Sequence, residues 1–574
     1  MFLKHNSLIL GLSLACIALP SCVDDKYDLS DVDTTVRVDV NQLTVPVKLD
    51  KIKLESILKE GDRIKIIDGN YMVVENGDFT SNAVYIAPVW IKSQLIPMTI
   101  VTLPYVPGVI SGDNIVMDFT TPESEFVLGA KSLPEEITAI DAIGGDLGFK
   151  FTISVGGLTN VARHVEFHDM LLQLPKGLTV TDAAGGSYDS ETGELSLPTM
   201  AITEECLVFT INATRADFNE MGAVFDGVNH SVDVKGGINI KSGKVAISDF
   251  IDPDRATDIK LYISYEVPDF QLTTFSGGLD YKFIGVSFTD IRLDGMPDLL
   301  EQPGTNLFVS NPCIFLSVEN PMQSYGLYAR TGFSITARHN SDLSTYSIDN
   351  PYFTIGNDHP DGVYTYCLSP VMPTSVPDGY GNAEHVPYSS LSDVLSNGGN
   401  PEVGIPSNLT IKLDNPNIPD QKIVDMPIGK FLKEVRGSYE FRAPIALKEG
   451  STIIYEEIVT GWGSEDFDYI TITQLDLDAE LTCDIPLALD IEAYPVDKDG
   501  KVIDNVRIEG AHINAGSEPQ NVHIHITGDV TGFDGIRYIA RATAGSGDKE
   551  LNANMNIIVS NLRPTISGYY MKEL

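Results

Sequence analysis

Residues 64–77 read IKIIDGNYMVVENG, in which the apolar runs Ile64–Ile67 and Tyr71–Val74 flank Asp68-Gly69, with Asn76-Gly77 at the end. β-Branched and aromatic residues favour strands. Asp-Gly and Asn-Gly favour tight turns with positive φ, which glycine and a few polar residues adopt at low cost. The stretch therefore predicts a β-hairpin around Asp68-Gly69 and a second turn at Asn76-Gly77.

Similar alternation of apolar and polar residues recurs along the chain. It is clear in residues 146–155, 231–247 and 552–560, and Val496–Ile503 predicts a further hairpin. In the second of these stretches the alternation is broken at two glycine-containing steps, Gly236-Gly237 and Ser242-Gly243.

Helical periodicity is scarce, and only Leu49–Lys59 and Ile428–Val435 predict short helices. Short strands with frequent turns predict a mainly β protein built from several tandem antiparallel β-sandwiches, since parallel sheets would need crossover helices. Asn-Pro steps punctuate the strands, as at Asn311-Pro312 and Asn320-Pro321. This habit resembles several Ig-like sandwich families.

The length of 574 residues exceeds what one hydrophobic core usually covers. Strand-poor stretches suggest where the chain divides. The expected segments are a signal peptide at 1–21, a tether at 22–42, an N-terminal β unit at 43–125, a sandwich at 126–255, a second sandwich at 256–437 with a loop insertion at 358–406, and a C-terminal sandwich at 438–574.

The first residues predict a secretion signal. A basic start at Lys4 precedes the apolar run Leu8–Leu19, which is too short for the roughly 20 residues that span a bilayer, and Pro20-Ser21-Cys22 follows. This ending resembles the lipobox of bacterial lipoproteins. The resemblance implies that Cys22 carries a thioether-linked diacylglycerol and an amide-linked third chain such as palmitate. The alternative is cleavage after Ser21, which would leave Cys22 an ordinary thiol.

Acidic residues crowd the tether directly after Cys22, with Lys26 among them: Asp24, Asp25, Asp28, Asp31 and Asp33. This pattern resembles the surface-export signal of Bacteroidetes lipoproteins, which implies an outer-membrane protein that faces the cell exterior. A solvated linker, extended by its own charge, is compatible with that role. Asp33-Thr34-Thr35 also resembles the O-glycosylation acceptor of these bacteria.

The charge balance excludes one class of partner. The chain has 39 Lys and Arg residues against 80 Asp and Glu residues, a formal net charge of −41. A polyanion of this size repels nucleic acid, and anionic headgroups would also repel it. We therefore expect no nucleic-acid partner and a body held off the membrane by its tether.

Four cysteines follow Cys22, without a C-x-x-C pair or histidines at zinc spacing. Each lies in a strand-like run, so we expect buried free thiols, although an extracellular compartment would permit a disulfide. These cysteines are Cys206, Cys313, Cys367 and Cys483.

Common catalytic signatures are absent from the sequence, which has no G-x-S-x-G elbow, P-loop or dinucleotide-binding glycine motif in a strand-to-helix setting. His164–His168 reads HVEFH and invites comparison with the zinc-protease helix. That motif needs glutamate directly after the first histidine, and the neighbouring residues predict a strand. We reject the motif and expect no catalytic activity and no cofactor.

His523 and His525 would share one face of a strand, because alternate residues do. They could bind a metal if Asp529 or a neighbouring strand supplied further ligands. Two ligands do not make a site, so we favour a polar outer face above a core face of the intervening apolar residues. Ser464–Asp468 and Asp497–Gly500 could offer carboxylates to Ca²⁺, but neither has EF-hand spacing, and no metal is assigned.

The lipoprotein resemblance covers residues 1 to about 35 and implies a membrane contact through Cys22. For the body we predict a non-catalytic binding or structural module whose ligand is an extracellular glycan or protein. The alternatives are a glycan-binding or glycan-degrading component of a polysaccharide-uptake system and a pilus-like subunit. Sugar faces commonly stack on aromatic rings, and this chain offers Trp90, Trp462 and 23 Tyr residues.

Overall fold

A computed structural model of the chain describes the residues to which all structural statements below refer. They are 35–44, 52–93, 96–104, 114–156, 162–202, 205–250, 258–281, 290–292, 308–338, 345–349, 352–395, 408–447, 449, 451–461, 470–504, 506–514, 516–545 and 549–573.

The hairpin predicted around Asp68-Gly69 is confirmed. Strands β3 (Ile64–Ile67) and β4 (Asn70–Thr80) pair antiparallel. Asp68 and Gly69 adopt positive φ values of 51° and 84° in the turn between them. Both residue types tolerate this conformation, so the local sequence is sufficient to form the turn.

The prediction of a second turn at Asn76-Gly77 is wrong, because β4 continues through these residues. A Cβ atom on Gly77 would lie 2.8 Å from the ring of Tyr439 on the neighbouring strand. Glycine is needed here for the close approach of a side chain from another part of the chain, which is a second common role of glycine in strands.

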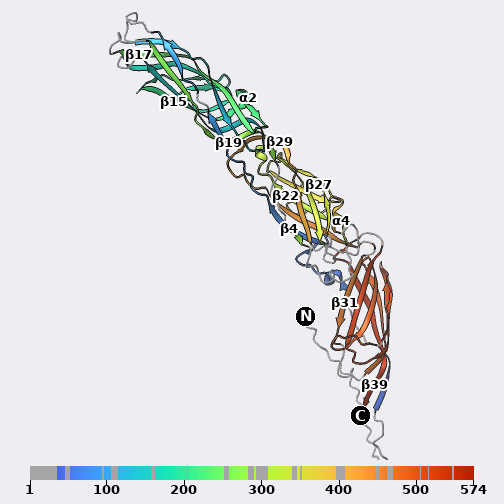
Figure 1. The fold of residues 1–574 in the computed structure, drawn as a ribbon. Helices are drawn as coiled ribbons and strands as arrows, with labels where there is room; N and C mark the ends of the chain where they lie inside the picture. The colour runs from blue at the N-terminus through green and yellow to red at the C-terminus, as the bar shows by residue number, and fades with distance from the viewer. Residues whose placement is uncertain are drawn as a thin grey trace, which may run out of the picture.

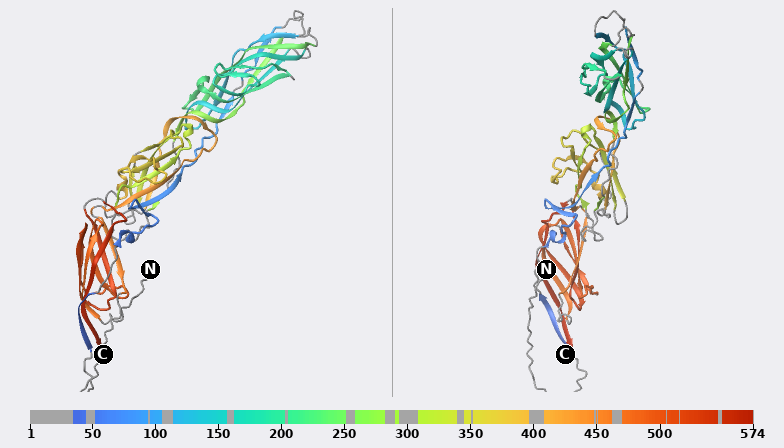
Figure 2. Two further views of the ribbon diagram at one scale, coloured as in Figure 1. Left: turned by 180° about the vertical axis from the view of Figure 1, so that it is seen from behind. Right: turned by 90° about the vertical axis from the view of Figure 1, so that its left-hand side faces the viewer.

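The sheets form three β units placed end to end in an elongated molecule (Figures 1 and 2). We call them the terminal unit, which contains β1 and β39, the central unit, and the far unit at the opposite end. The fold is mainly β with few short helices and antiparallel sheets, as predicted; among the described pairs, β26 and β27 are parallel.

The far unit is a 16-stranded system. Its elements are β5 (Trp90–Ser93), β6 (Thr99–Leu103), β7 (Asn114–Phe119), β8 (Ser124–Ala130), β9 (Ile137–Gly156), β10 (Ala162–Gln173), β11 (Leu178–Asp182), β12 (Ser187–Asp189), β13 (Glu194–Ser196), β14 (Met200–Ala201), β15 (Cys206–Asp217), α2 (Phe218–Met221), β16 (Val224–Asp226), β17 (Ser231–Phe250), β18 (Ile259–Glu266), β19 (Phe270–Tyr281) and β29 (Ile418–Pro427).

The central unit has an eight-stranded and a five-stranded sheet. The first contains β3, β4, β21 (Phe308–Val309), β22 (Cys313–Glu319), β26 (Val363–Ser369), β27 (Glu384–Pro387), β30 (Arg436–Leu447) and β38 (Lys549–Glu550). The second contains β20 (Ile291–Arg292), β23 (Ala329–Arg338), β24 (Thr345–Asp349), β25 (Phe353–Ile355) and β28 (Asn408–Asp414). The short helices η3 (Gln323–Tyr325) and α4 (Leu391–Leu395) join strands of this unit.

The terminal unit has a six-stranded and a four-stranded sheet. The first contains β1 (Thr35–Thr44), β2 (Ile52–Lys53), β32 (Ile470–Cys483), β34 (Arg507–Glu509), β36 (Gly516–Val530) and β39 (Asn556–Glu573). The second contains β31 (Thr452–Val459), β33 (Leu487–Val496), β35 (Ala511–Ile513) and β37 (Gly535–Ala544). Helix α1 (Leu54–Ile57) follows β2 and lies within the segment predicted to be helical.

The chain runs the length of the molecule and returns, as the colours in Figure 1 show. Consequently β1 pairs with β39, β4 with β30, and β19 with β29. The domain limits inferred from the sequence remain predictions, and strand pairing crosses several of them. Residues 35–42, assigned to the tether by the sequence, form most of β1.

The interruptions noted at Gly236-Gly237 and Ser242-Gly243 do not end the strand, since β17 is continuous. The alternation of buried residues does change phase between Ile240 and Gly243, where the register with β10 shifts. Cβ atoms on Gly236 and Gly243 would lie 2.3 Å and 2.7 Å from Phe126 and Phe119. These glycines admit aromatic rings from neighbouring strands.

The helix predicted at Ile428–Val435 is absent. Residues 428–430 form a bend in which Gly429 has a φ of 72°, and Phe431 forms a bridge with Tyr85. The amides of Gly429 and Leu432 donate to the carbonyls of Ile86 and Val84, both at 2.9 Å. A neighbouring extended segment therefore satisfies the backbone groups that a helix would have satisfied internally.

Buried aromatic side chains pack in the cores of the far and central units. In the far unit, Phe151 stacks on Phe209 with ring centroids 4.9 Å apart. In the central unit, Tyr71, Tyr439 and Phe441 are fully buried. No helix in the described ranges is long and apolar enough to cross a membrane.

Candidate functional site

The residues predicted to anchor the protein lie outside the described ranges. These are Cys22, the aspartates that follow it, and the first two residues of Asp33-Thr34-Thr35. The described chain begins with β1, whose residues are almost all exposed although it pairs along β39. Trp462 and Ser464–Asp468 also lie outside.

The predicted strand around HVEFH is confirmed, because His164–His168 lies within β10. Glu166 is placed between the two histidines on one face of the strand. Its two oxygens accept from His164 Nε2 at 2.9 Å and from His168 Nε2 at 3.1 Å. Each histidine thus meets a different oxygen of one carboxylate.

His523 and His525 lie on β36, and the predicted burial of the residues between and beside them is confirmed. Val522, Ile524 and Ile526 are buried, whereas the two histidines occupy the outer face. Their rings lie nearly parallel, with centroids 5.9 Å apart.

The neighbouring strand β32 places carboxylates opposite both histidines. Asp478 is paired with His523 and Asp476 with His525 in the antiparallel register. Asp478 Oδ1 accepts from His523 Nδ1 at 2.7 Å, and Asp476 Oδ1 accepts from His525 Nδ1. His523 Nε2 also lies 3.7 Å from Asp476 Oδ1.

Asp476 has the most buried side chain of this cluster, which is 17% exposed. Its second oxygen accepts a hydrogen bond of 2.6 Å from Gln474 Nε2. Partial burial acts to raise the pKa of Asp476, but hydrogen bonds from His525 and Gln474 and the charges of the two histidines bring this pKa below its usual value.

Sequence reasoning missed Asp476 and Asp478. Their alternation within β32 is visible in the sequence as the polar face of a strand, but nothing local indicates that β36 lies beside it. Among the described residues, one group can bring together three ligand atoms within 4.8 Å: Asp476, His523 and His525. Asp529 is exposed and does not belong to it.

The predicted hairpin turn at Asp497–Gly500 is confirmed. Val496 and Val502 form an antiparallel bridge, and Asp497 Oδ1 accepts from the amides of Asp499 and Lys501, both at 2.9 Å. The Asp497 carboxylate is therefore used within the turn, as aspartate commonly is at such positions.

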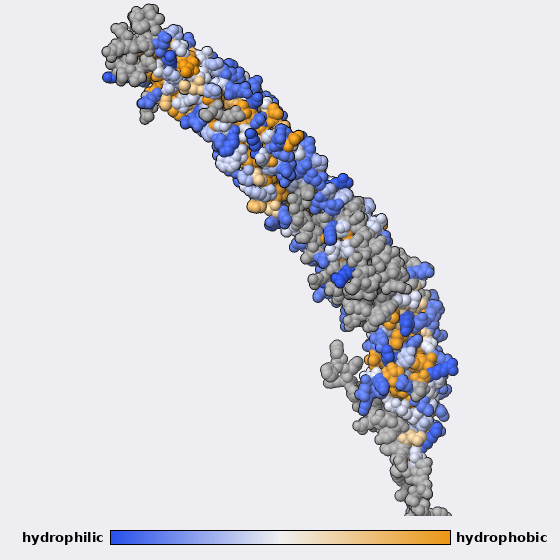
Figure 3. All heavy atoms as spheres, in the orientation of Figure 1, coloured by the Kyte–Doolittle hydropathy of each residue, from blue (hydrophilic) through white to orange (hydrophobic). Residues whose placement is uncertain are grey.

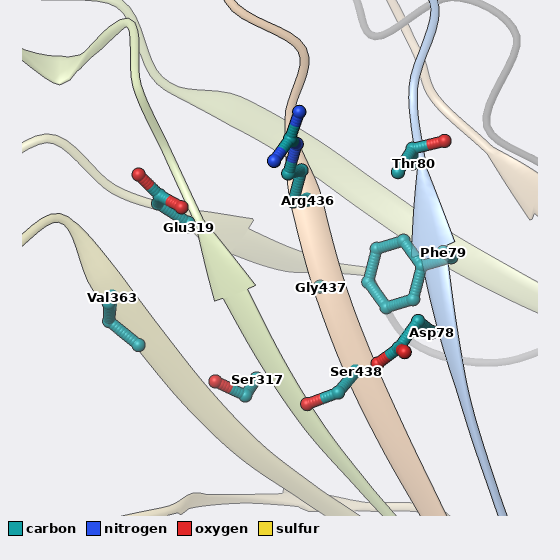
Figure 4. Close-up of a pocket in the computed structure, with 9 residues that line it drawn as sticks. All are labelled: Asp78, Phe79, Thr80, Ser317, Glu319, Val363, Arg436, Gly437 and Ser438. Carbon is teal, nitrogen blue, oxygen red and sulfur yellow. The ribbon is translucent and has the colours of Figure 1, made fainter.

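A cavity of about 490 Å³ lies on the central unit (Figure 4). Figure 4 shows the ring of Phe79 beside Gly437 and Arg436 at one end of the lining. The lining residues are Asp78, Phe79, Thr80, Ser317, Glu319, Val363, Arg436, Gly437 and Ser438. Because Phe79 is only 6% exposed, the cavity presents polar groups and no aromatic platform.

A second cavity, of about 610 Å³, lies in the terminal unit beside the hydrogen bond of 2.6 Å between His512 Nδ1 and Asp490 Oδ1. Arg541, Glu492 and Tyr494 also line it. Tyr494 donates to Glu492 at 2.8 Å, so the polar groups that line it form two separate pairs, of which one contains a histidine.

Exposed aromatic side chains occur near the junction of the far and central units. Tyr85 and Phe431 form an antiparallel bridge and are 47% and 74% exposed, with ring centroids 4.7 Å apart. Trp90, on β5, is 52% exposed. On the face in Figure 3, hydrophobic surface occurs in patches among hydrophilic residues.

The described cysteines are free. Cys313, Cys367 and Cys483 are buried, as predicted, whereas Cys206 is partly exposed. Cys313 and Cys367 lie together in a small cluster with Phe315 and Tyr380. Contact with Cys367 and burial both raise the pKa of the Cys313 thiol.

No protein-family profile matches the chain, and no curated protein matches it. A crystal structure of a protein from Parabacteroides distasonis, predicted to be secreted, is similar over 50% of this chain and 82% of its own length, with 15% sequence identity and a TM-score of 0.35.

Proposed function

We propose that the chain is a non-catalytic outer-membrane lipoprotein that acts as a stalk, carrying its far unit outward as a binding or structural module of the cell surface. The arrangement of three units end to end supports this proposal, because β1 and the last strand, β39, pair at one end of the molecule (Figures 1 and 2). Cys22 precedes β1 in the sequence, so an anchor there would hold the terminal unit next to the membrane.

The number of residues between Cys22 and β1 is compatible with a stalk. Because β1 begins at Thr35, the segment 22–34 remains to connect Cys22 to the first strand. At about 3.5 Å per residue it reaches at most about 45 Å. The net charge of −41 would repel anionic headgroups and favour projection of the body away from them.

The anchor is tested by membrane fractionation of the full chain with Cys22→Ala. The wild-type chain should sediment with membranes, because two or more acyl chains bind stably, and the variant should be released. Ser21→Ala, which leaves the cysteine in place, is the control. Retention of Cys22→Ala in the membrane fraction would contradict the proposal.

The stalk is tested by energy transfer to acceptor lipids in the outer leaflet. In a Cys206→Ser background, donors are attached at Arg163→Cys, at the start of β10, or at Lys498→Cys, in the turn after β33. Transfer should be efficient from position 498 and weak from position 163. Equal transfer from the two positions would show that the molecule lies along the surface.

A glycan-binding role is the second candidate, and the exposed rings of Trp90, Tyr85 and Phe431 favour it. The full chain should then bind members of a glycan array, and Trp90→Ala or Phe431→Ala should weaken binding several-fold. Tyr352→Ala, a change of another exposed ring in the central unit, is the control. Binding unaffected by the first two changes would remove these rings as a sugar platform.

A further inference from the structure

We propose that Asp476, His523 and His525 form a binding site for a divalent transition-metal ion such as Zn²⁺ on the outer face of the terminal unit. The site joins β32 to β36, strands that are adjacent in the six-stranded sheet. It is independent of the anchor and of the stalk proposal.

The strand register brings the three ligands together. His523 and His525 are two residues apart on β36 and therefore share a face, and Asp476 lies directly opposite His525 on β32. One ligand atom from each of the three residues lies within 4.8 Å of the others. Asp476 Oδ1 lies 3.7 Å from His523 Nε2 and accepts a hydrogen bond from His525 Nδ1. Zinc bonds of 2.0–2.2 Å place neighbouring ligand atoms about 3.3 Å apart, so small side-chain rotations suffice.

Two further groups hold the ligands in orientation. Gln474 Nε2 donates to the second oxygen of Asp476 at 2.6 Å, which leaves Oδ1 directed at the histidines. His523 donates from Nδ1 to Asp478 at 2.7 Å, which leaves its Nε2 facing Asp476. A carboxylate on the distal nitrogen of a histidine is the usual support of a metal ligand, since it fixes the tautomer and raises the basicity of the ligating nitrogen.

The surrounding strands complete the electrostatic setting. Glu509 on β34 lies opposite His525, and Thr565 on β39 lies opposite Asp476. Glu509 pairs with Arg507 at 3.1 Å, and Arg563 on β39 is paired with Asp478 in the register. The neighbouring charges are therefore largely balanced, and the carboxylate of Asp476 supplies the negative charge of the site itself.

Two imidazoles and one carboxylate suit zinc, nickel, copper or iron(II) better than magnesium or calcium, which prefer oxygen ligands alone. The His523 side chain is 55% exposed, so water can occupy the remaining coordination positions. Binding of the ion would replace the hydrogen bond between His525 Nδ1 and Asp476 and release its proton.

The terminal unit contains a matched control for this cluster. His512 and Asp490 form a single cross-strand pair at 2.6 Å in the four-stranded sheet. This pair has the same chemistry as half of the proposed site but lacks a second converging histidine. A change of His512 therefore removes a histidine from the unit without touching the site.

The site is tested by Zn²⁺ titration calorimetry on the full chain with Cys22→Ala, purified without a histidine tag. We expect saturable binding of one ion per chain, and a Co²⁺ complex with a tetrahedral visible spectrum. Asp476→Asn, His523→Asn and His525→Asn should each weaken binding at least ~10-fold, and Asp478→Asn about 10–100-fold. His512→Asn should leave the affinity unchanged.

Diffuse attraction of Zn²⁺ to the acidic surface is a competing explanation for binding, and the same experiment distinguishes it from binding at the proposed site. If Zn²⁺ binds only through diffuse attraction to a chain of charge −41, millimolar Ca²⁺ will displace it and His512→Asn will matter as much as His523→Asn. That result, or the absence of saturable binding, overturns the proposal. Because the cobalt spectrum is recorded on unchanged ligands, a variant that fails to fold does not obscure the outcome.

Discussion

Thr35 is paired with Glu573 in the antiparallel register of β1 and β39, so residues 538 positions apart in sequence lie side by side at one end of the molecule. β1 gains this position through backbone pairing, because its side chains are almost all exposed. The ribbon of β1 and β39 is therefore held mainly by hydrogen bonds, with little apolar burial.

Hydrogen exchange should reveal this difference within one sheet. Amides of β1 should exchange faster than those of β32, which lies inside the sheet and contributes buried residues such as Leu475 and Leu481, because opening β1 exposes little apolar surface. Exchange followed by mass spectrometry measures both strands in one sample. Equal protection of β1 and β32 would contradict the expectation.

Gly437→Ala should destabilise the central unit by about 1–3 kcal/mol, since overpacking a well-filled site costs roughly this much. The new Cβ would lie 2.2 Å from Phe79 Cζ and 2.6 Å from the Ser317 carbonyl oxygen. Urea unfolding measures the loss. Gly61→Ala is the matched control, because a Cβ there meets nothing within 4 Å, and a comparable loss in both variants would refute the packing argument.

Cys206 should be the described cysteine that alkylating reagents modify first in the native chain. It is partly exposed, whereas Cys313, Cys367 and Cys483 are buried, and burial raises the pKa of the Cys483 thiol. Peptide mass mapping after brief treatment with iodoacetamide tests this order. Modification of Cys483 as fast as Cys206 would show that its strand opens readily.

His512 should titrate above the usual histidine value of about 6.5. Its hydrogen bond to Asp490 raises its pKa, so the pair contributes stability that is complete below the unfolded pKa and is lost as the pH rises through the folded pKa. NMR titration of the ring protons measures this pKa. Asp490→Asn should lower it, and an unchanged value would mean that the contact does not persist in solution.

The sequence alone predicts a local feature correctly where that feature depends on residues nearby in the chain. Asp68-Gly69 carries its own turn preference, and the apolar residues beside His523 indicate their burial by alternation. Asn76-Gly77 carries a similar preference, but the ring of Tyr439, from a strand more than 350 residues later, requires the same glycine for a different reason.

The cluster of Asp476, His523 and His525 could not be predicted from the sequence for a related reason. Asp476 meets His525 only because β32 lies beside β36 in one register, and a shift of one residue would turn the carboxylate to the other face. The non-helical conformation of Ile428–Val435 likewise depends on Val84 and Ile86, far away in the sequence. Local patterns thus predict strands and turns, while their partners depend on the whole fold.

The pairing of β1 with β39 also has a mechanical consequence. If the chain is tethered through the residues before Thr35 and the far unit is pulled, the load enters along the axis of β1. Hydrogen bonds in an antiparallel pair run across the strands, so such a load acts on all the bonds between Thr35 and Thr44 together. The ribbon would resist shear as a unit, whereas a load that peeled Thr35 away from Glu573 would break the same bonds one at a time.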